Sequence, residues 1–427
     1  MVFRQEMRNC KITYINKEAQ THIKTISNAF SLRKINTISK IKGKVSIIFK
    51  NKCIKLLILI NLFFQIISIR KTYFLEMKFS NISLKVKGIG QHQIMGDSRE
   101  NYAFPKAYYP NYVYINGEIQ NIVNYSYYFN QSDNLVQLVW NDPISFTKYM
   151  FYDCTDITEI DLSNFDFSKS SSMYYMFTNC RSLTSINFAN IKTSQVTFMD
   201  CLFWNCSSLS HLNLSGFDTS KVTSMGTMFS GCSSLTYLDL SSFDTKKVTY
   251  MPSIFRNCSS LISVDLSSFD TTQVTYMSNM FSGCISLTSL NLSNFYTPRL
   301  IYMANMFAGC INLEYINMKN FYSFNLAISN DIFDGVPENI IVAIQSNMED
   351  ILIQLRRKKC FKSIWLDDWK SKQQLITSDN SKCLDSCDND TTYKYEFNGK
   401  CYKNCSNGFL TDENGNTINK CKCQPIR

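Results

Sequence analysis

The sequence predicts an α/β solenoid, a right-handed coil between a small N-terminal β module and a C-terminal cysteine-rich tail. Three observations predict it: cysteines recur every 26 residues, a Phe stands three residues before each, and the apolar spacing changes within each unit. A strict period of this length is typical of solenoids, whose units bury their apolar faces on one another. The seven cysteines are Cys154, Cys180, Cys206, Cys232, Cys258, Cys284 and Cys310.

Residues 1–79 form a basic leader. Through Lys78 they hold 16 Lys and Arg against three acidic residues, and residues 56–69 form an apolar segment. This segment is short for a membrane-spanning helix, which needs about 20 residues. It suits the apolar region of a secretory signal, or a signal anchor, behind a basic flank. The alternative is a buried helix of a soluble domain, but nothing nearby would pack on it.

Residues 80–141 are expected to form a small β-rich module that caps the first coil. The runs "ISLKVKGIG", "YVYINGEIQ", "YSYYFN" and "NLVQLVW" are typical of short strands, and Asn116-Gly117 is a hairpin signal. Capping is the expected role because the exposed end of a solenoid must be covered. The alternative is a carbohydrate platform built from four tyrosines, Tyr108, Tyr109, Tyr112 and Tyr114.

Residues 142–336 hold the seven repeats, and each is expected to contain a helical turn, a strand and a corner. Met225, Met228, Phe229 and Cys232 stand at i, i+3, i+4 and i+7, the spacing of one helical stripe. The residue before each Cys is Asp, Asn or Gly, types that tolerate the left-handed conformation closing a helix.

The strand and the corner follow the Cys in each repeat. In the run "TYLDLS", Leu238 and Leu240 alternate with polar residues, as expected of a short strand with one buried face. At the corner, Asp218, Asp244 and Asp270, each with the Thr that follows, are expected to bond locally to turn amides. One helical turn, one strand and one corner make a leucine-rich-repeat-like coil. The repeated cysteines are expected to be buried, reduced thiols, because each lies on the apolar stripe.

The chain ends in two further segments. Residues 337–372 are expected to add a capping strand and an amphipathic helix over "MEDILIQLRRKKCFKSIWLDDW". Residues 373–427 form a small cysteine-rich tail that cannot bury a large core and therefore needs cross-links, either disulfides or a bound metal. We expect disulfides rather than zinc, since the tail has no His and lacks paired C-x2-C spacing. The six cysteines are Cys383, Cys387, Cys401, Cys405, Cys421 and Cys423.

The repeat motif "VTxMxxMFxxCxSLxxLDLSxFDTS" resembles that of the BspA-like leucine-rich-repeat surface proteins of bacteria and protists. The resemblance covers Met150 to about Val336. It implies a cell-surface adhesin or recognition protein, and it supplies no catalytic residues.

The candidate ligand-binding residues lie on the solvent side of the predicted strands, the concave face of the coil. Stacked strands about 5 Å apart would align them as an Asp/Asn ladder with a variable column beside it. The alternative is a hydrogen-bonded solvent face that binds nothing. The residue type varies along the flanking column, where core packing does not constrain it, and this variation favours a role in recognition. The candidates are Glu159, Asp161, His211, Asn213, Tyr237, Asp239, Asp265, Asn291, Tyr315 and Asn317.

The sequence favours binding over catalysis. It holds three His far apart and no phosphate loop, Ser/His/Asp arrangement or metal motif, so we expect no enzyme, no cofactor and no metal site. The repeats carry 10 basic and 14 acidic side chains between Phe146 and Val336, which argues against nucleic acid as a partner.

We therefore expect an extracellular or cell-surface protein that binds a host or cell-surface protein or glycan. The alternative is an intracellular protein–protein interaction scaffold of the same fold. Membrane contact is expected only through the N-terminal signal or anchor, or through a missing C-terminal anchor. Secretion by a eukaryote would place N-linked glycan at Asn124 or Asn130, which lie in N-x-S/T triplets.

Overall fold

The computed structural model describes residues 80–97, 103–322 and 326–358, and beyond them only short strands. All of these belong to one compact unit, 79–427. The predicted leader with its apolar segment 56–69 lies outside the described residues. Among the described residues, no helix has the length and apolarity that a membrane crossing requires.

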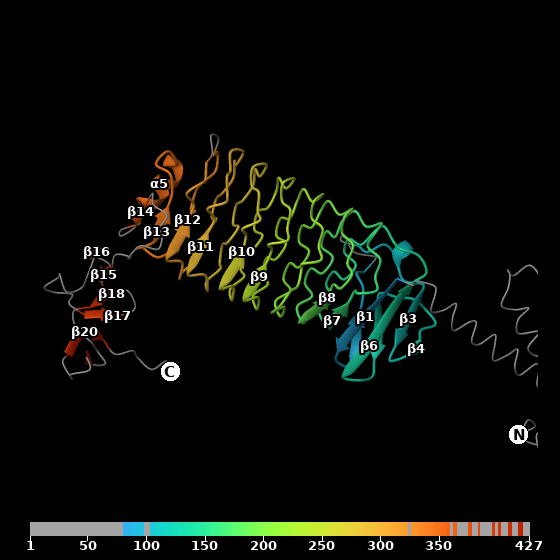
Figure 1. Ribbon diagram of the computed structural model, residues 1–427. Coiled ribbons are helices and arrows are strands. Elements are labelled where there is room, and N and C mark those ends of the chain that lie inside the picture. The colour runs from blue at the N-terminus through green and yellow to red at the C-terminus, as the bar shows by residue number, and fades with distance from the viewer. Residues whose placement is uncertain are drawn as a thin grey trace, which may run out of the picture. The chain divides into compact units, whose positions relative to one another are not determined.

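The N-terminal module is an antiparallel β-structure (Figure 1). Asn116 and Gly117 have φ of 51° and 87° and form the predicted hairpin turn between β3 and β4. In β1 every second side chain is buried, which gives the module a core on one side of its sheet. Its elements are β1 (Ser80–Lys87), β2 (Gly90–Gln93), the 3-10 helix η2 (Lys106–Tyr108), β3 (Tyr112–Ile115), β4 (Glu118–Ile119), β5 (Ser126–Phe129) and β6 (Asp133–Trp140).

The module continues directly into the solenoid through a shared sheet. The strand order is β4-β3-β6-β1-β7-β8, where β7 is Ile157–Asp161 and β8 is Ser185–Asn187. β1 pairs antiparallel with β7, while β7 and β8 pair in parallel as successive coils. His92 adds a second contact, with its Nδ1 2.9 Å from the Oδ2 of Asp156 in the first coil. The open edge of the first coil is therefore hydrogen-bonded to the module.

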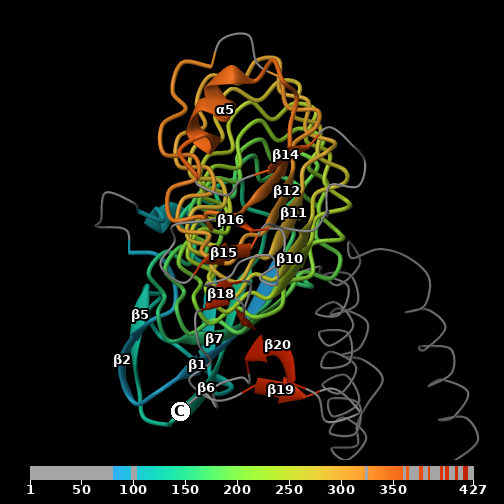
Figure 2. The same cartoon turned by 90° about the vertical axis from the view of Figure 1, so that its left-hand side faces the viewer.

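Parallel strands 26 residues apart mark the successive coils of the solenoid. Tyr237 is paired with Ser263 and Ser289 with Tyr315, so equivalent residues of neighbouring coils lie side by side. Seen from the end that carries α5, the coils lie behind one another (Figure 2). The later strands are β9 (Tyr237–Asp239), β10 (Ser263–Asp265), β11 (Ser289–Asn291), β12 (Tyr315–Asn317) and β13 (Ile341–Ala343).

The predicted helical turn of each repeat is wrong: the described coils are β-solenoid turns without helix. Thr227 and Gly231 both have left-handed backbones, with φ of 60° and 76°, and such residues interrupt a right-handed helix. Phe229 N–H donates to the carbonyl of Ile254 in the next coil at 2.9 Å, while Cys232 N–H donates within its own turn to Phe229 at 3.1 Å. Bonds to the neighbouring coil thus replace part of the helical ladder. The same side chains still point inward, so the leucine-rich-repeat-like α/β character was misjudged although the buried stripe was not.

The coil geometry continues past the last repeated cysteine. The residue before each Cys has a positive φ, as predicted, and the same pair of left-handed residues recurs at Asp331 and Gly335. Val336 then takes the position of the Cys and is buried. One further turn without a cysteine therefore extends the stack.

A column of stacked Phe rings runs through the core of the solenoid. Neighbouring rings are nearly parallel, and their centroids are 5.4 to 5.9 Å apart. Each Phe side chain points inward, and each coil repeats the position of the coil before it. Identical rings therefore pack against one another, as close packing of a protein interior requires. The column consists of Phe151, Phe177, Phe203, Phe229, Phe255, Phe281, Phe307 and Phe333.

The seven repeated cysteines form a second buried column of free thiols, as predicted. The Sγ of Cys232 donates to the carbonyl of Phe203 in the preceding coil at 3.2 Å, and the Sγ of Cys258 donates to that of Phe229 at 3.1 Å. The six thiols from Cys180 to Cys310 all bond to the preceding coil in this way, whereas Cys154 in the first coil donates to the Tyr152 carbonyl at 3.8 Å. Burial raises the pKa of Cys232 to about 12, so this thiol stays protonated under physiological conditions.

Native alkylation should leave the cysteine column unlabelled. A protonated, buried thiol is a poor nucleophile, because the thiolate is the reactive form. We expect Cys232, Cys258 and Cys284 to resist iodoacetamide at about pH 8 in the folded chain and to react after denaturation without reductant, as read by mass spectrometry. Labelling that needs a reductant would contradict the prediction, because it would show that these thiols are oxidised.

The Thr of each corner bonds between coils, not locally as predicted. Thr245 is buried; its Oγ1 donates to the Asp270 carbonyl at 2.9 Å and accepts the Asp270 N–H at 2.8 Å. Asp270 itself does form the predicted local turn, since its Oδ1 accepts the N–H of Thr272 at 2.9 Å. The buried Thr column is Thr193, Thr219, Thr245, Thr271 and Thr297. Four Thr hydroxyls of this column satisfy both backbone groups of one corner residue in the next coil, and the fifth, that of Thr271, donates to the Tyr296 carbonyl at 2.8 Å.

One buried carboxylate interrupts the uniform columns. Asp200 is 8% exposed, and its Oδ1 accepts hydrogen bonds from the Ser224 hydroxyl and from the Gly226 N–H. Burial raises the pKa of Asp200 despite these two bonds. A Cβ on Gly226 would stand 3.1 Å from that Oδ1 and 2.8 Å from the Tyr250 ring, so a larger residue there would require the Tyr250 side chain to move.

The C-terminal segment closes the last coil by strand addition. The predicted amphipathic helix is shorter than expected, since α5 spans Glu349–Leu355 and β14 (Lys362–Ile364) then pairs in parallel with β13. β14 hydrogen-bonds to backbone groups at the edge of β13. A helix over the same residues would leave those groups without a partner strand.

The tail carries a sheet of its own, in the order β16-β15-β18-β17-β20-β19. Of the six predicted disulfide cysteines, the structure describes the side chain of Cys401 on β18, which is buried and disulfide-bonded. The pairing of the full set stays a prediction. The strands are β15 (Leu375–Thr377), β16 (Cys383–Leu384), β17 (Tyr395–Phe397), β18 (Lys400–Tyr402), β19 (Phe409–Thr411) and β20 (Thr417–Cys421).

Candidate functional site

The solvent side of β7 to β12 and of residues 211–213 forms one surface, here called the strand face. Nine of the ten predicted binding residues reach solvent there, at least in part: Glu159, Asp161, His211, Asn213, Tyr237, Asp239, Asp265, Asn291 and Tyr315. Asn317 does not reach solvent, because it is 5% exposed, so its predicted exposure on this face is wrong. It lies in β12, which pairs with β11 and with β13.

The Asp and Asn side chains of the strand face have a structural role in each coil. The Oδ1 of Asp239 accepts the N–H of Ser241 at 2.9 Å, and that of Asp265 accepts the N–H of Ser267 at 2.9 Å. Such bonds close the turn that follows each strand. Hydrogen bonds from Ser241 lower the pKa of Asp239. One oxygen of each side chain is thus committed, and the second oxygen or the amide nitrogen is what remains for a ligand.

Between the first two coils, the ladder also links coil to coil. The Nδ2 of Asn187 donates to the Oδ1 of Asp161 at 3.0 Å across paired β8 and β7. That contact satisfies a donor of one side chain with an acceptor of the next. At this end of the solenoid, the ladder side chains therefore hydrogen-bond to one another, as the alternative of a solvent face without a ligand expects.

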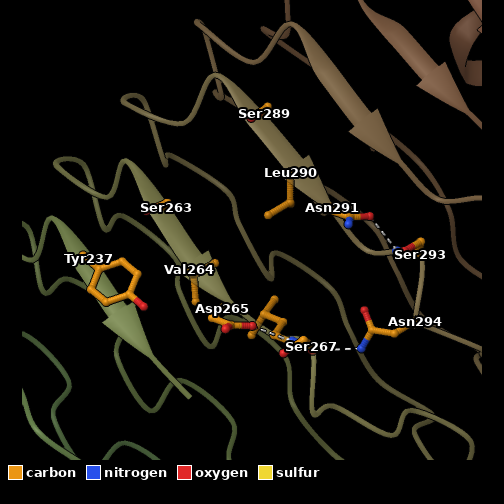
Figure 3. A pocket seen from close by; sticks show the side chains of 11 residues that line it. Tyr237, Ser263, Val264, Asp265, Ser267, Ser289, Leu290, Asn291, Ser293 and Asn294 are labelled. Carbon is orange, nitrogen blue, oxygen red and sulfur yellow. Dashed lines mark hydrogen bonds between the residues drawn. The ribbon is translucent and has the colours of Figure 1, made fainter. Parts of the chain in front are cut away.

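The strand face opens between β10 and β11. These strands belong to separate sheets, although the coils that carry them are adjacent. A groove of about 590 Å³ lies between them (Figure 3). Its volume falls in the range of about 300–1,000 Å³ that is usual for small-molecule sites. It is lined by Tyr237, Ser263, Val264, Asp265, Leu266, Ser267, Ser289, Leu290, Asn291, Ser293 and Asn294.

Side-chain bonds fasten the two coils at both ends of this opening. Before the strands, the Oγ of Ser286 donates to the Ser259 carbonyl at 2.7 Å. After them, the Nδ2 of Asn294 donates to the carbonyls of Leu266 and Phe269 at 2.8 and 3.0 Å. On the other side of the coil, the N–H of Phe255 still donates to the Met280 carbonyl at 2.9 Å. The opening is therefore a groove that is closed at both ends, between two coils that stay joined elsewhere.

A smaller hollow, of about 60 Å³, lies where the ladder is interrupted a second time. Residues 211–213 form no strand, and the hollow is lined by Asn213 and Leu212 on one side and by Asp239 and Ser241 on the other. His211 is exposed beside it and contacts Ser210, with its Nδ1 3.0 Å from the hydroxyl. Both hollows thus coincide with positions where neighbouring coils do not pair on the strand face.

Several groove residues were missed by sequence reasoning. Ser263 and Ser289 stand in the variable column beside the ladder, but a Ser in a Ser-rich repeat carries no signal of a site. Asn294 occupies a position that is Ser in the two preceding repeats, Ser242 and Ser268, which is the one sequence sign of its bridging role. In the described part of the chain, no three His, Cys, Asp or Glu side chains gather as a metal site requires.

The tyrosines of the alternative carbohydrate platform lie in two places along the chain. Tyr108 and Tyr109 are partly buried and pack against the core, whereas Tyr112 and Tyr114 lie at alternate positions of β3, with Tyr112 41% exposed. The platform stays an alternative. Asn124 and Asn130 are both exposed, as glycan attachment requires, and their modification stays a prediction.

Comparison with known proteins finds one family. The model of the family described as "Mycoplasma protein of unknown function, DUF285" matches three overlapping segments, residues 111–209, 184–265 and 236–339. Together they span more than half of the 427 residues. Neither the curated proteins nor the solved structures include a significant match to this chain.

Proposed function

The chain belongs to the DUF285 family, and on its fold we propose that it is an extracellular or cell-surface recognition protein of the BspA-like kind, an adhesin that binds a protein or glycan ligand on the strand face. The proposed role is binding, not catalysis. Solenoids present extended surfaces whose residues change without disturbing the core, and binding is the usual work of such surfaces.

The observation that carries this proposal is that some polar atoms of the strand face close turns whereas others, in the groove, have no structural role. The Asp and Asn oxygens that close turns are the same in every coil, but the groove between β10 and β11 adds a shaped opening with polar atoms that the fold does not use. The variable column contributes the exposed Tyr237, which is 53% exposed beside this groove. An exposed aromatic next to unused polar groups is typical of a recognition surface.

The predicted leader and tail support an extracellular location over an intracellular scaffold. Residues 56–69 suit a secretory signal or anchor, and a cysteine-rich tail with disulfides is typical of oxidising compartments. The N-terminal residue and the disulfides of the mature chain, measured by mass spectrometry, separate the two alternatives. A retained leader with reduced tail cysteines would favour the intracellular scaffold.

Removing the strand-face side chains should abolish adhesion without unfolding the chain. We expect the triple variant Tyr237→Ala, Asp239→Ser, Asp265→Ser to melt within about 0.5 kcal/mol of the parent, as exposed substitutions usually do. Ser keeps a weaker form of the turn bond that Asp makes. Adhesion to cells or to immobilised host surface proteins should be lost.

Its matched control is the double variant Lys221→Ala, Lys247→Ala, which changes exposed residues away from the strand face. This control should adhere like the parent. If the triple variant also adheres like the parent, the strand face is only a solvated ladder, and the N-terminal module or the tail becomes the candidate site.

A further inference from the structure

We propose that the groove between β10 and β11 is a binding site for a neutral oligosaccharide. This inference rests on the proposed recognition function and names its ligand class and its place. The groove holds a carboxylate, carboxamides, hydroxyls and an aromatic ring over an apolar floor. A sugar presents the complementary set: hydroxyls that both donate and accept, and a ring face of C–H groups.

The central observation is a pair of complementary side chains that the fold leaves apart. Asp265 and Asn291 occupy the positions that Asp161 and Asn187 occupy in the first two coils, where amide and carboxylate are bonded at 3.0 Å. Because β10 and β11 do not pair, this bond is not made in the groove. Each of the two makes only its turn bond in the described chain, Asp265 to Ser267 and Asn291 to Ser293.

The atoms left over fit adjacent hydroxyls of one sugar ring. The Nδ2 of Asn291 has two N–H donors, and the Oδ2 of Asp265 is an acceptor. One hydroxyl can accept from the amide while its neighbour donates to the carboxylate. Figure 3 shows both side chains at the C-terminal ends of their strands, on opposite sides of the opening, with Ser263 and Ser289 at the other ends. Hydrogen bonds of this kind with a charged acceptor are the stronger ones.

Tyr237 supplies the aromatic surface of the site. It is paired with Ser263 across β9 and β10 and lines the groove with an exposed ring. A Tyr ring offers an apolar face and a polar tip, which suits a ligand with both kinds of surface. Val264 and Leu290 form part of the floor, so the C–H side of a bound sugar would not lie against unsatisfied polar groups.

Charge and shape argue against other ligand classes. The described lining residues include one carboxylate and no Lys, Arg or His, so an anionic ligand would meet a like charge without a counter-charge. A quaternary ammonium ligand is usually held by several aromatic rings, whereas Tyr237 is the one aromatic residue of this lining. An extended peptide would have to run along the gap, where the bonds of Ser286 and Asn294 close both ends.

Binding to a panel of immobilised oligosaccharides tests the inference. The full chain, produced in bacteria without N-linked glycan, is applied to neutral, sialylated and sulfated oligosaccharides, and affinities are then measured by calorimetry with the free sugars. We expect binding to neutral members of the panel, weakened at least about tenfold in Asn291→Ala and in Tyr237→Ala, as for the loss of a good hydrogen bond or ring contact.

Asn187→Ala is the matched control, since it removes the same side chain in the same column where the strands pair. It should bind the sugar like the parent. All variants should stay folded, and Asn187→Ala should lose at least as much stability as Asn291→Ala, because it removes a turn bond and the bond to Asp161. Neutral-sugar binding that is unaffected by Asn291→Ala would overturn the groove as the site. Binding of sialylated or sulfated members alone, or of no sugar at all, would overturn the ligand class.

The two proposals fail in distinguishable ways. If no sugar binds but the strand-face triple variant loses adhesion to a protein surface, recognition by the strand face stands and the sugar inference fails. If the triple variant keeps full adhesion, the recognition proposal fails, and the sugar inference that rests on it fails too. Asn291 also begins an N-x-S triplet, so complete glycan occupancy there in chain secreted by eukaryotic cells would fill the groove and overturn the inference.

Discussion

Replacing Phe229 by Ala should lower the free energy of unfolding by about 3–5 kcal/mol, the range for large aromatic truncations in a core. The ring is fully buried and stacks between Phe203 and Phe255, with centroids 5.7 and 5.8 Å away. Truncation removes both contacts and leaves a cavity that the flanking coils cannot fill, because each is held to its own neighbours. Urea denaturation followed by circular dichroism measures the loss.

The exposed Phe198 provides the control for this prediction. It is 45% exposed and bridges to Ser172 and Ser224 through its backbone alone, so Phe198→Ala should stay within about 0.5 kcal/mol of the parent. A loss below about 1 kcal/mol for Phe229→Ala would mean that the Phe column is not the continuous core described above.

Replacing Thr245 by Val should cost about 2–4 kcal/mol, although the two side chains have nearly the same shape. The substitution leaves the N–H and the carbonyl of Asp270 without their partner, and an unsatisfied buried group costs about 1–3 kcal/mol. Because both bonds are only part-buried, we expect the lower part of that range for each group. The same denaturation measurement applies. Thr245→Ser retains the hydroxyl and should recover most of the stability.

Thr249 separates the effect of the hydrogen bonds from that of β-branching. It is exposed and makes one long bond, 3.4 Å, to the Thr223 carbonyl. Thr249→Val should therefore be close to neutral. If Thr245→Val were equally neutral, the buried Thr column would contribute packing and not hydrogen bonding between coils.

The sequence predicted which side chains face the core but not the backbone that carries them. Met225, Phe229 and Cys232 are buried as expected, yet Thr227 between them has a left-handed conformation that breaks the expected helix. Apolar residues three and four apart mark one side of a helix, and a series of tight turns produces the same spacing. Only hydrogen bonds to the next coil decide between the two, and those depend on partners 25 residues away. No local pattern contains that information.

The candidate face was predicted from the sequence, whereas its groove was not. Alternation placed Tyr237 and Asp239 on the solvent side, as the structure has them. The opening between β10 and β11 could not be predicted from the sequence, because the two repeats whose strands stay unpaired are as regular as the repeats whose strands pair. The burial of Asn317 was not predicted either, because its residue type and its place in the repeat match those of the exposed column.

The buried Asp200 has a consequence for how the chain finds its correct alignment while folding. Identical Phe, Cys and Thr columns make the coils nearly interchangeable, so a chain that skipped one coil would recover most of its contacts. Such a slip would place Asp200 opposite Pro252 instead of Gly226, and Pro has no N–H to donate. It would also replace the Ser224 hydroxyl with the ring of Tyr250. A buried carboxylate without donors is costly, so this one irregular layer penalises misalignment that the repeated layers would tolerate.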